Sequence, residues 1–200
     1  MSIFYFIKFV YILFFAAILI IRLIYSLIEV GSPFPSFKNK KKFKEKILEW
    51  NPLIIFSFLI FISLKHILRN ESFFPQSIDL FFQFNLIIKI FGAIIGLIGL
   101  FLLARGYYSL GHFWKIGIDQ KFKAELITSG IFKYTRNPIY SFFNLFALSF
   151  FCLSGRLIYL IIFIILVINF HWEILREEKF LRGVFGEKYE EYFRKTPRYL

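Results

Sequence analysis

The stretch that decides the fold runs from Ile139 to Phe170 and reads IYSFFNLFALSFFCLSGRLIYLIIFIILVINF. Arg156 is the single charged residue in it. As one helix, this stretch would measure about 48 Å, far beyond the roughly 30 Å hydrocarbon core of a bilayer. Ser154-Gly155-Arg156 interrupts it near the middle, and a glycine after an apolar run is a helix stop signal. We therefore predict two short membrane helices joined in a tight hairpin.

Two polar clusters stand at the ends of this apolar stretch. The first reads Tyr134-Thr135-Arg136-Asn137-Pro138-Ile139-Tyr140, and the second runs from Glu177-Glu178 through Phe185-Gly186-Glu187 and Tyr189 to Thr196-Pro197-Arg198. A hairpin returns the chain to the membrane face that it left, so Arg136 and Glu177 should emerge on the same side. A single long span would instead separate them by the whole bilayer.

The composition excludes a soluble domain. Hydrophobic residues make up 58% of the chain, and 31 residues are Phe, more apolar surface than a core of this size could bury. The formal net charge of +12 would suit a nucleic-acid partner, but Lys and Arg gather at the ends of apolar segments, as membrane proteins place them. We expect anionic membrane lipid as a partner, and no nucleic acid. The single cysteine, Cys152, excludes a disulfide framework and a thiolate metal site.

The predicted fold class is an all-α integral membrane protein with about five transmembrane helices. Besides the hairpin, apolar segments of spanning length cover roughly 3–28, 51–70 and 80–104. The first lacks a clear small-residue cleavage pattern, which favours a permanent span over a signal peptide. Gly92, Gly96 and Gly99 in the third would let a neighbouring helix backbone approach closely. Lys89 would be an intramembrane charge, either functional or, if the helix begins late, snorkelling to the interface.

The distribution of loop charges predicts the orientation of the chain. Residues 1–105 hold three helices with a Lys-rich loop at 31–50, and residues 106–200 hold a connector at 106–137, the hairpin at 138–172 and a helical tail at 173–200. The Lys-rich loop, the connector and the tail share one face, which is much richer in Lys and Arg than the other. The positive-inside rule makes this face cytoplasmic and puts the N-terminus outside. We expect a multi-pass protein of the cell (inner) membrane.

The C-terminal part of the chain resembles the isoprenylcysteine carboxyl methyltransferase family, which is related to membrane phospholipid methyltransferases. Five ordered pieces between about 110 and 198 carry the resemblance: Leu110-Gly111-His112-Phe113-Trp114, then Leu126 to Tyr134, Arg136-Asn137-Pro138-Ile139-Tyr140, Glu177-Glu178 with Leu181, and Phe185-Gly186-Glu187-Lys188-Tyr189 with Tyr192. The resemblance implies a multi-span helical enzyme that uses S-adenosyl-L-methionine. It also implies a cofactor pocket built from the connector and the tail, and a lipophilic or prenylated acceptor that enters from the bilayer.

Two positions depart from the family pattern. Asn137 stands where the family usually has His, and its amide can form hydrogen bonds but cannot titrate, which excludes a proton-shuttling role. Glu173 stands where the family often has an Arg four residues before the paired Glu, and Arg176 is displaced from that position. The second departure leaves recognition of a substrate carboxylate, and so the identity of the substrate, open.

The chemistry of methyl transfer suggests roles for the charged residues. A carboxylate acceptor is ionised at neutral pH and needs a cation to hold it, which the planar fork of Arg136 could supply. Arg136 could equally be a basic anchor at the head of a helix. Glu177 and Glu178 lie about 100° apart on a helix, so we expect one to receive the cofactor's ribose hydroxyls or ammonium and the other to pair with Arg182. A solvated acidic face is the alternative interpretation of this pair.

We predict Arg136 and Glu177 as catalytic residues, with no metal site. Cofactor contacts are expected from Tyr134, Asn137, Pro138, Tyr140, Glu177, Glu178 and Tyr189, and substrate contacts from Arg136, Trp114 and Arg176. The tyrosines could equally be interfacial aromatics without a function. The expected activity is O-methylation of an isoprenylcysteine-like carboxylate. The alternatives are N-methylation of a phospholipid amine, which would need Glu177 as a base, and a non-catalytic membrane protein that keeps the fold.

Overall fold

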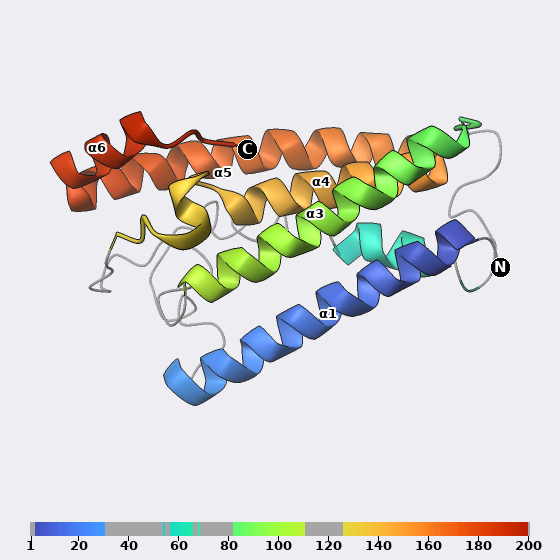
Figure 1. Ribbon diagram of the computed structural model, residues 1–200, viewed down its shortest axis with the longest axis horizontal. Coiled ribbons are helices and arrows are strands. Elements are labelled where there is room, and N and C mark those ends of the chain that lie inside the picture. Colours follow the sequence, from blue (N-terminus) through green and yellow to red (C-terminus); the bar gives the residue numbers. More distant parts are fainter. Residues whose placement is uncertain are drawn as a thin grey trace.

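Helices form the elements of the chain that the structure describes. The computed structural model describes residues 3–30, 54, 57–65, 68, 82–110 and 126–199. Its elements are α1 (Ile3–Val30), a helical stretch at 57–65, α3 (Leu86–Leu110), the short 3-10 helix η3 (Gly130–Lys133), α4 (Pro138–Ser154), α5 (Leu157–Phe185) and α6 (Glu187–Lys195). The long helices run side by side, and α6 folds back along the end of α5 (Figure 1).

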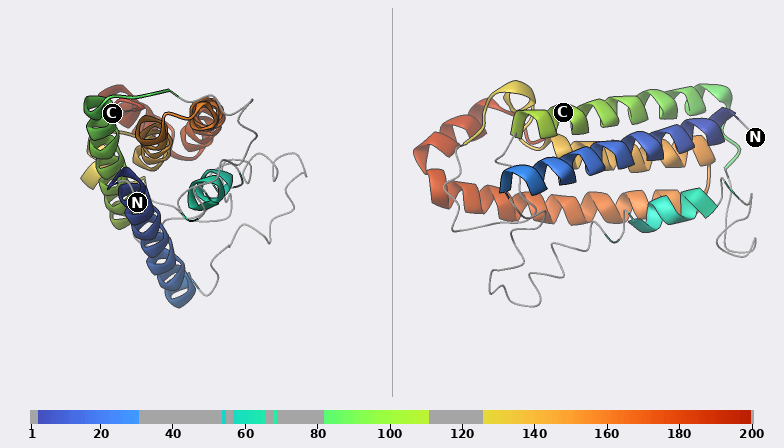
Figure 2. Two further views of the ribbon diagram at one scale, coloured as in Figure 1. Left: turned by 90° about the vertical axis from the view of Figure 1, so that its right-hand side faces the viewer. Right: turned by 90° about the horizontal axis from the view of Figure 1, so that it is seen from below.

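The central helix of the bundle is α4, which lies between α3 and α5 when the molecule is viewed end-on (Figure 2). Phe142, Phe146 and Phe150 follow one another at one-turn spacing, and each is fully buried. Phe15 of α1 stacks on Phe142 with the ring centroids 5.5 Å apart. Because lipid is as apolar as these rings, they stabilise the bundle through close van der Waals packing and aromatic geometry, not through exclusion of water.

The turn between α4 and α5 depends on Gly155. This residue adopts a φ of 70°, in the left-handed region, and its N–H donates to the carbonyl of Phe151 over 2.7 Å. A side chain at this position would strain the backbone. The helix α5 begins at Leu157, and the two helices pack against each other in opposite directions. The turn therefore brings the start of α4 alongside the last turns of α5.

The buried face of α5 continues from apolar residues to a carboxylate. Its buried residues are Tyr159, Ile162, Leu166, Phe170, Ile174 and Glu178. Spacings of three and four residues place them on one face of the helix, which packs toward α4. Glu178 thus lies on the core side of α5, next to the start of α4, where Pro138 occupies the first helical position. Pro is suited to this position because its missing N–H has no partner there in any helix.

Glycines let α3 approach α4 closely, as the sequence predicts. A Cβ added at Gly92 would lie 2.6 Å from the Cβ of Cys152, and one added at Gly96 would lie 2.6 Å from Oγ of Ser149. Both distances are far below ordinary van der Waals contact. Small residues at such a contact allow the backbones of two membrane helices to approach each other.

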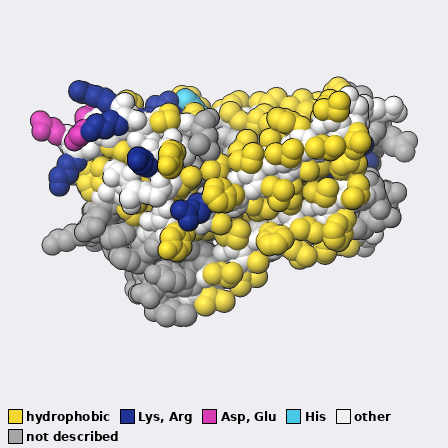
Figure 3. Space-filling model, viewed as in Figure 1, with side chains coloured by type: hydrophobic (Ala, Val, Ile, Leu, Met, Phe, Trp, Pro, Cys, Tyr) yellow, Lys and Arg dark blue, Asp and Glu magenta, His cyan; other side chains and the backbone are white. Residues whose placement is uncertain are grey.

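Two of the described helices, α3 and α5, are long and apolar enough to cross a membrane. The helix α4, with 17 residues, is apolar but shorter. Hydrophobic side chains cover most of one face of the molecule, whereas charged side chains gather toward the end formed by α6 and the last turns of α5 (Figure 3). The structure therefore has an apolar body and one strongly polar end. The five-span count and the orientation remain predictions.

The third apolar helix differs in position from the sequence prediction. It was expected over about 80–104, but α3 begins at Leu86 and ends at Leu110. Asn85 explains the start, because its Oδ1 accepts a hydrogen bond from the backbone N–H of Ile88 over 3.0 Å and so caps the helix. Lys89 consequently lies in the first turn, with its Nζ 5.2 Å from the ring centroid of Phe4. This is the late start that favours snorkelling for Lys89 over an intramembrane function.

Three expected segments lie wholly or partly outside the described residues. The second apolar segment, at about 51–70, is described at 54, 57–65 and 68, and the stretch 57–65 is helical. The Lys-rich loop at 31–50 is not among the described residues, and neither are residues 111–125 of the connector.

The close approach of α3 and α4 can be tested with a pair of Gly→Ala substitutions. Gly183 in α5 has nothing within 4 Å of an added Cβ, so Gly183→Ala should leave stability unchanged or raise it by up to about 1 kcal/mol. Gly92→Ala should instead destabilise by about 1–3 kcal/mol through overpacking. Tryptophan-fluorescence melting in detergent should show a lower apparent Tm for Gly92→Ala alone. Equal melting of the two variants would contradict the packing described here.

Candidate active site

The start of α4 and the C-terminal segment are joined by backbone and side-chain hydrogen bonds. The N–H of Arg136 donates to the carbonyl of Pro197 over 2.9 Å. Oγ1 of Thr135 and Nδ2 of Asn137 both donate to the carbonyl of Arg198, each over 3.2 Å. The two polar clusters that the sequence places about forty residues or more apart therefore meet in space.

A buried ion-pair network lies at the centre of this contact. Nη2 of Arg136 donates to Oε1 of Glu178 over 2.9 Å, and Arg198 holds the same carboxylate with two N–H groups, at 3.0 Å and 2.7 Å. The side chains of Arg136 and Glu178 are only 7% and 5% exposed. Glu178 is thus held by two guanidinium groups from different segments, which keeps it ionised although it is buried. The hydrogen bond to Glu178 raises the pKa of Arg198 above its usual value.

Most of the donors of Arg136 are used by the protein itself. Its Nη1 donates to the carbonyls of Phe193 and Thr196, over 2.6 Å and 2.7 Å. Its guanidinium also lies over the ring of Phe193, 3.9 Å from the centroid. The buried Nε has no hydrogen-bond partner. Arg136 therefore cross-links α4, α5 and the C-terminal segment, and a ligand oxygen could reach a free donor only at Nε or at the second N–H of Nη2.

Two tyrosines of α6, Tyr189 and Tyr192, lie beside the ion-pair network. Tyr189 is almost fully buried, and Oη of Tyr192 donates to the carbonyl of Phe132 over 2.7 Å. Burial raises the pKa of Tyr189 to about 12, and the negative charge of Glu178 adds to the rise. Burial also raises the pKa of Tyr192. Both phenols are therefore neutral at physiological pH and can donate hydrogen bonds.

Glu177 points away from the ion-pair network, as expected for neighbours on a helix. Its carboxylate accepts a hydrogen bond from the side chain of Tyr140. The ring of Tyr140 packs on Phe170, with the centroids 5.3 Å apart. Glu177 and Tyr140, both predicted cofactor contacts, thus lie together at the junction of α4 and α5.

The expected pairing between Glu178 and Arg182 is wrong. Arg182 pairs with Glu190 of α6 at 2.9 Å, because the turn at Gly186 folds α6 back against the end of α5. A residue four positions on is a common partner on an isolated helix, but here Arg136 and Arg198 together hold the carboxylate of Glu178 with three hydrogen bonds.

The remaining predicted residues divide by location. Asn137 and Pro138 are buried at the start of α4, whereas the side chain of Tyr134 is 63% exposed. Arg176, predicted to contact substrate, pairs with Glu173 at 2.8 Å, so the two residues of the second family departure neutralise each other. Trp114 lies outside the described residues.

Several participants in the site were not predicted as site residues. Arg198 supplies two bonds to Glu178, Phe193 receives the guanidinium of Arg136, and His171 shares a 2.9 Å hydrogen bond with Tyr199. Thr196-Pro197-Arg198 was recognised as the end of a polar cluster, but nothing in its spacing specifies which carboxylate Arg198 would meet. Among the described residues no group of His, Cys, Asp and Glu is suited to hold a metal ion.

The donors and acceptors of this site suit a zwitterionic, hydroxyl-bearing ligand. The Nε of Arg136 is an orphaned buried donor, which costs about 1–3 kcal/mol unless a ligand oxygen satisfies it. Glu177 offers a carboxylate to an ammonium or hydroxyl group. S-adenosyl-L-methionine carries oxygen acceptors, an ammonium group and hydroxyl groups, so the residues present fit it.

Comparison with known proteins gives two matches. The family model described as phospholipid methyltransferase matches residues 87–188, just over half of the chain. The match includes Arg136, Glu177 and Glu178 and ends before Arg198. Protein-S-isoprenylcysteine O-methyltransferase from Schizosaccharomyces pombe is 36% identical over 73 residues, which are 36% of this chain and 31% of that protein. The chain thus aligns with about a third of the length of this curated relative.

The ion-pair network can be tested by removing its carboxylate. Glu178→Ala leaves two guanidinium groups facing each other, one of them buried, and should destabilise the chain by about 3–5 kcal/mol. Glu191→Ala is the matched control, because Glu191 forms an exposed ion pair with Lys195 at 2.6 Å and should change stability little. Detergent melting and limited proteolysis should show early loss of the C-terminal segment in Glu178→Ala. Similar behaviour of both variants would contradict a central role for Glu178.

Proposed function

The chain belongs to the phospholipid methyltransferase family, and from this premise we propose that it is an S-adenosyl-L-methionine-dependent membrane enzyme that O-methylates the carboxylate of an isoprenylcysteine-like acceptor. The observation that carries the proposal is the contact between Arg136 and Glu178, both within the matched region, at the polar end of an apolar bundle. That contact assembles one site from the two polar clusters.

The donor molecule, when bound, supplies an electrophilic methyl group, and the chain supplies positioning and exclusion of water. We assign Glu177 and Tyr140 to the polar groups of the donor, because they lie together at the junction of α4 and α5. Glu178 and Arg136 position this region, since they fix α5 and the C-terminal segment against the start of α4. In this role Arg136 acts mainly as a cross-link and offers a ligand its buried Nε.

An ionised carboxylate acceptor needs no general base, only a cation near it. Arg198 suits this task because its side chain is 28% exposed while one edge remains on Glu178. Arg176 is the second candidate, because its side chain is 32% exposed although it pairs with Glu173 at 2.8 Å. The acceptor would enter from the bilayer, which borders the apolar faces of α4 and α5.

A second candidate function is N-methylation of a phospholipid amine, which the description of the family favours. An amine must lose a proton before or during methyl transfer, and Glu177 is the carboxylate that could accept it. The two functions therefore differ in what they require of Glu177: a base for an amine, a binding group for a carboxylate acceptor.

Methyl transfer from radiolabelled S-adenosylmethionine tests the proposal. We expect transfer to an N-acetylated isoprenylcysteine and none to phosphatidylethanolamine. Arg136→Lys keeps the positive charge but loses the planar guanidinium group, and Glu177→Gln removes a negative charge that would bind the methyl donor. Each substitution should reduce kcat/KM at least tenfold, which corresponds to about 1.4 kcal/mol of transition-state stabilisation. Glu187→Gln, at an exposed position of α6, is the control and should retain activity.

Three results would count against the proposal. Unchanged activity in both site variants would remove the site assignment. Transfer to phosphatidylethanolamine alone, abolished by Glu177→Gln, would establish the amine reaction instead. No binding of labelled S-adenosylmethionine to the detergent-purified chain would favour a non-catalytic membrane protein that keeps the fold.

We also propose a multi-pass location in the cell (inner) membrane, with the N-terminus outside, the site cytoplasmic and anionic lipid near its basic residues. Lys133 and Gln83 are exposed and lie at opposite ends of the bundle, since Phe82 bonds to Gly155 at the α4–α5 turn. In a Cys152→Ala background, Lys133→Cys and Gln83→Cys should react with an impermeant maleimide from opposite sides of the membrane. Reaction from the same side would contradict the hairpin topology.

A further inference from the structure

The ring of Phe193 lies against two arginines that come from different parts of the chain. The guanidinium carbon of Arg136, which precedes α4, is 3.9 Å from the ring centroid, and that of Arg182, near the end of α5, is 4.2 Å from it. At such distances a guanidinium lies over the face of a ring, where the negative part of the ring quadrupole attracts a cation. Phe193 therefore contacts the site arginine and α5 at the same time.

Each of these two arginines also has its own carboxylate. Arg136 donates to Glu178 over 2.9 Å, and Arg182 pairs with Glu190 of α6 over 2.9 Å. Because a separate carboxylate balances each guanidinium, two cations can lie over one ring without an uncompensated repulsion between them. The ring of Phe193 thus joins a buried ion pair to a partly exposed one.

The hydrogen bonds of Arg136 hold the edges of its guanidinium but leave the tilt of the plane less restricted. Nη1 donates to the carbonyls of Phe193 and Thr196, and Nη2 donates to Glu178. Hydrogen bonds to such oxygens have a broad angular distribution, so they tolerate a donor group that tilts. A ring over the face restrains this tilt by direct contact. The contact with the face therefore sets the direction in which Nε of Arg136 points.

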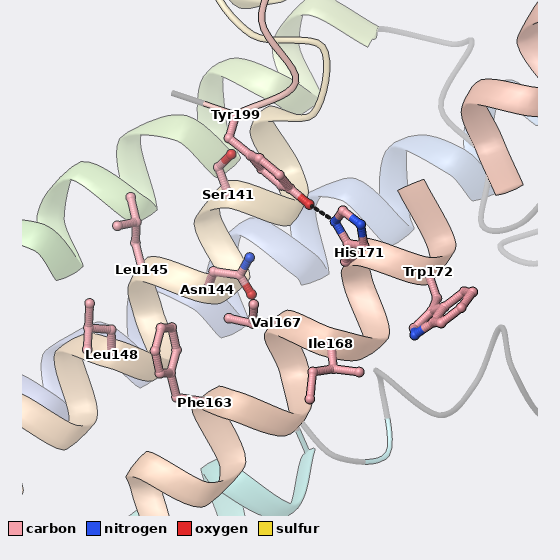
Figure 4. A pocket seen from close by; sticks show the side chains of 10 residues that line it. All are labelled: Ser141, Asn144, Leu145, Leu148, Phe163, Val167, Ile168, His171, Trp172 and Tyr199. Atoms are coloured by element: carbon pink, nitrogen blue, oxygen red, sulfur yellow. Dashed lines mark hydrogen bonds between the residues drawn. The ribbon is translucent and has the colours of Figure 1, made fainter. Parts of the chain in front are cut away.

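The C-terminal segment that carries the two carbonyl acceptors is also held beyond them (Figure 4). Its Tyr199 points toward His171 of α5, with Oη and Nδ1 2.9 Å apart. The N–H of Arg136 donates to the carbonyl of Pro197 in the same segment. The ring of Phe193 thus belongs to a stretch of chain that is anchored on α5 at its far end and on Arg136 in between.

We propose that Phe193 is a positioning residue for the methyl donor: its ring fixes the plane of the Arg136 guanidinium, so that the buried Nε keeps one orientation toward an oxygen of S-adenosyl-L-methionine. This inference rests on the proposed function. Nε suits such a contact because, among the described residues, it has no hydrogen-bond partner. A leucine would fill a similar space without a quadrupole, so the orientation of Arg136 depends on the aromatic face of Phe193.

Fluorination of the ring tests the orientation of Arg136 without any methyl donor. Replacing Phe193 by mono-, di- and trifluorophenylalanine withdraws electron density from the faces step by step while the shape changes little. In the full chain in detergent, with isotope-labelled arginine, the Nε–H signal of Arg136 is identified by its loss in Arg136→Lys. We expect hydrogen exchange at this N–H to accelerate about tenfold between phenylalanine and trifluorophenylalanine, because a loosened guanidinium meets water more often.

The same series at Phe150 is the matched control. Phe150 is fully buried in α4, and its ring packs on those of Phe146 and Tyr159, with the centroids 4.8 Å and 6.1 Å away. Fluorination there reports its effect on aromatic contacts and should leave exchange at Arg136 unchanged. Exchange at Arg136 that does not depend on fluorination of Phe193, or that responds equally to both series, would overturn the positioning role.

Equilibrium binding of labelled S-adenosylmethionine tests the link between Phe193 and the methyl donor. Phe193→Leu should raise the Kd about tenfold, and the trifluorinated ring should have the same effect. Phe193→Tyr keeps the aromatic face and should restore the Kd to within about twofold of the wild-type value. A loss of affinity in Phe193→Tyr equal to that in Phe193→Leu would make the ring a space-filling group and would contradict the inference.

The wild-type chain separates a failure of this inference from a failure of the proposed function. If the wild type binds no S-adenosylmethionine, the proposed function is wrong. Exchange at Arg136 that responds to fluorination would then still support the orientation of Arg136 by the ring. If the wild type binds S-adenosylmethionine and the Kd does not depend on the ring, the proposed function stands and the role assigned to Phe193 is wrong.

Discussion

The carboxylate of Glu178 is held by guanidinium groups from positions 42 residues before it and 20 residues after it. This interaction requires a precise fold, because ions taken out of water lose several kcal/mol of solvation each, which only well-aligned partners offset. The bundle meets that requirement by placing Glu178 on the same helical face as Leu166, Phe170 and Ile174. The apolar packing of that face determines where the charge lies. In turn, the charge fixes the C-terminal segment against α4.

The turn at Gly155 is the second constraint on this arrangement, and it acts from the far end of the bundle. Without a left-handed residue there, α4 and α5 would not return along each other, and Arg136 would lie on the opposite side of the apolar layer from Glu178. The glycines of α3 fix α4 on its other flank by letting the backbones approach at Gly92 and Gly96. The positions of the site residues thus depend on backbone features up to a full helix length away.

Much of this could be predicted from the sequence because it depends on length and periodicity. The apolar stretch is too long for one crossing, its glycine marks the break, and the two polar clusters meet as a consequence. Side-chain partners could not be predicted in the same way. The spacing on a helix suggested an ion pair between Glu178 and Arg182. Because the chain turns at Gly186 and α6 folds back, Arg182 pairs with Glu190 instead, and Glu178 pairs with Arg198. The start of α3 was also missed, because Leu80 to Phe84 are apolar apart from Gln83, and the cap at Asn85 marks the boundary.

The structure also changes what Arg136 can contribute to chemistry. A guanidinium that already serves two carbonyls, a carboxylate and an aromatic face is fixed in place, and a fixed group can position others without meeting the substrate. Arg198 holds Glu178 by one edge and has a side chain that remains partly exposed. Because Arg136 and Arg198 differ in exposure, we expect them to have different roles. The buried arginine maintains the site, and the partly exposed one is available to an anionic ligand group.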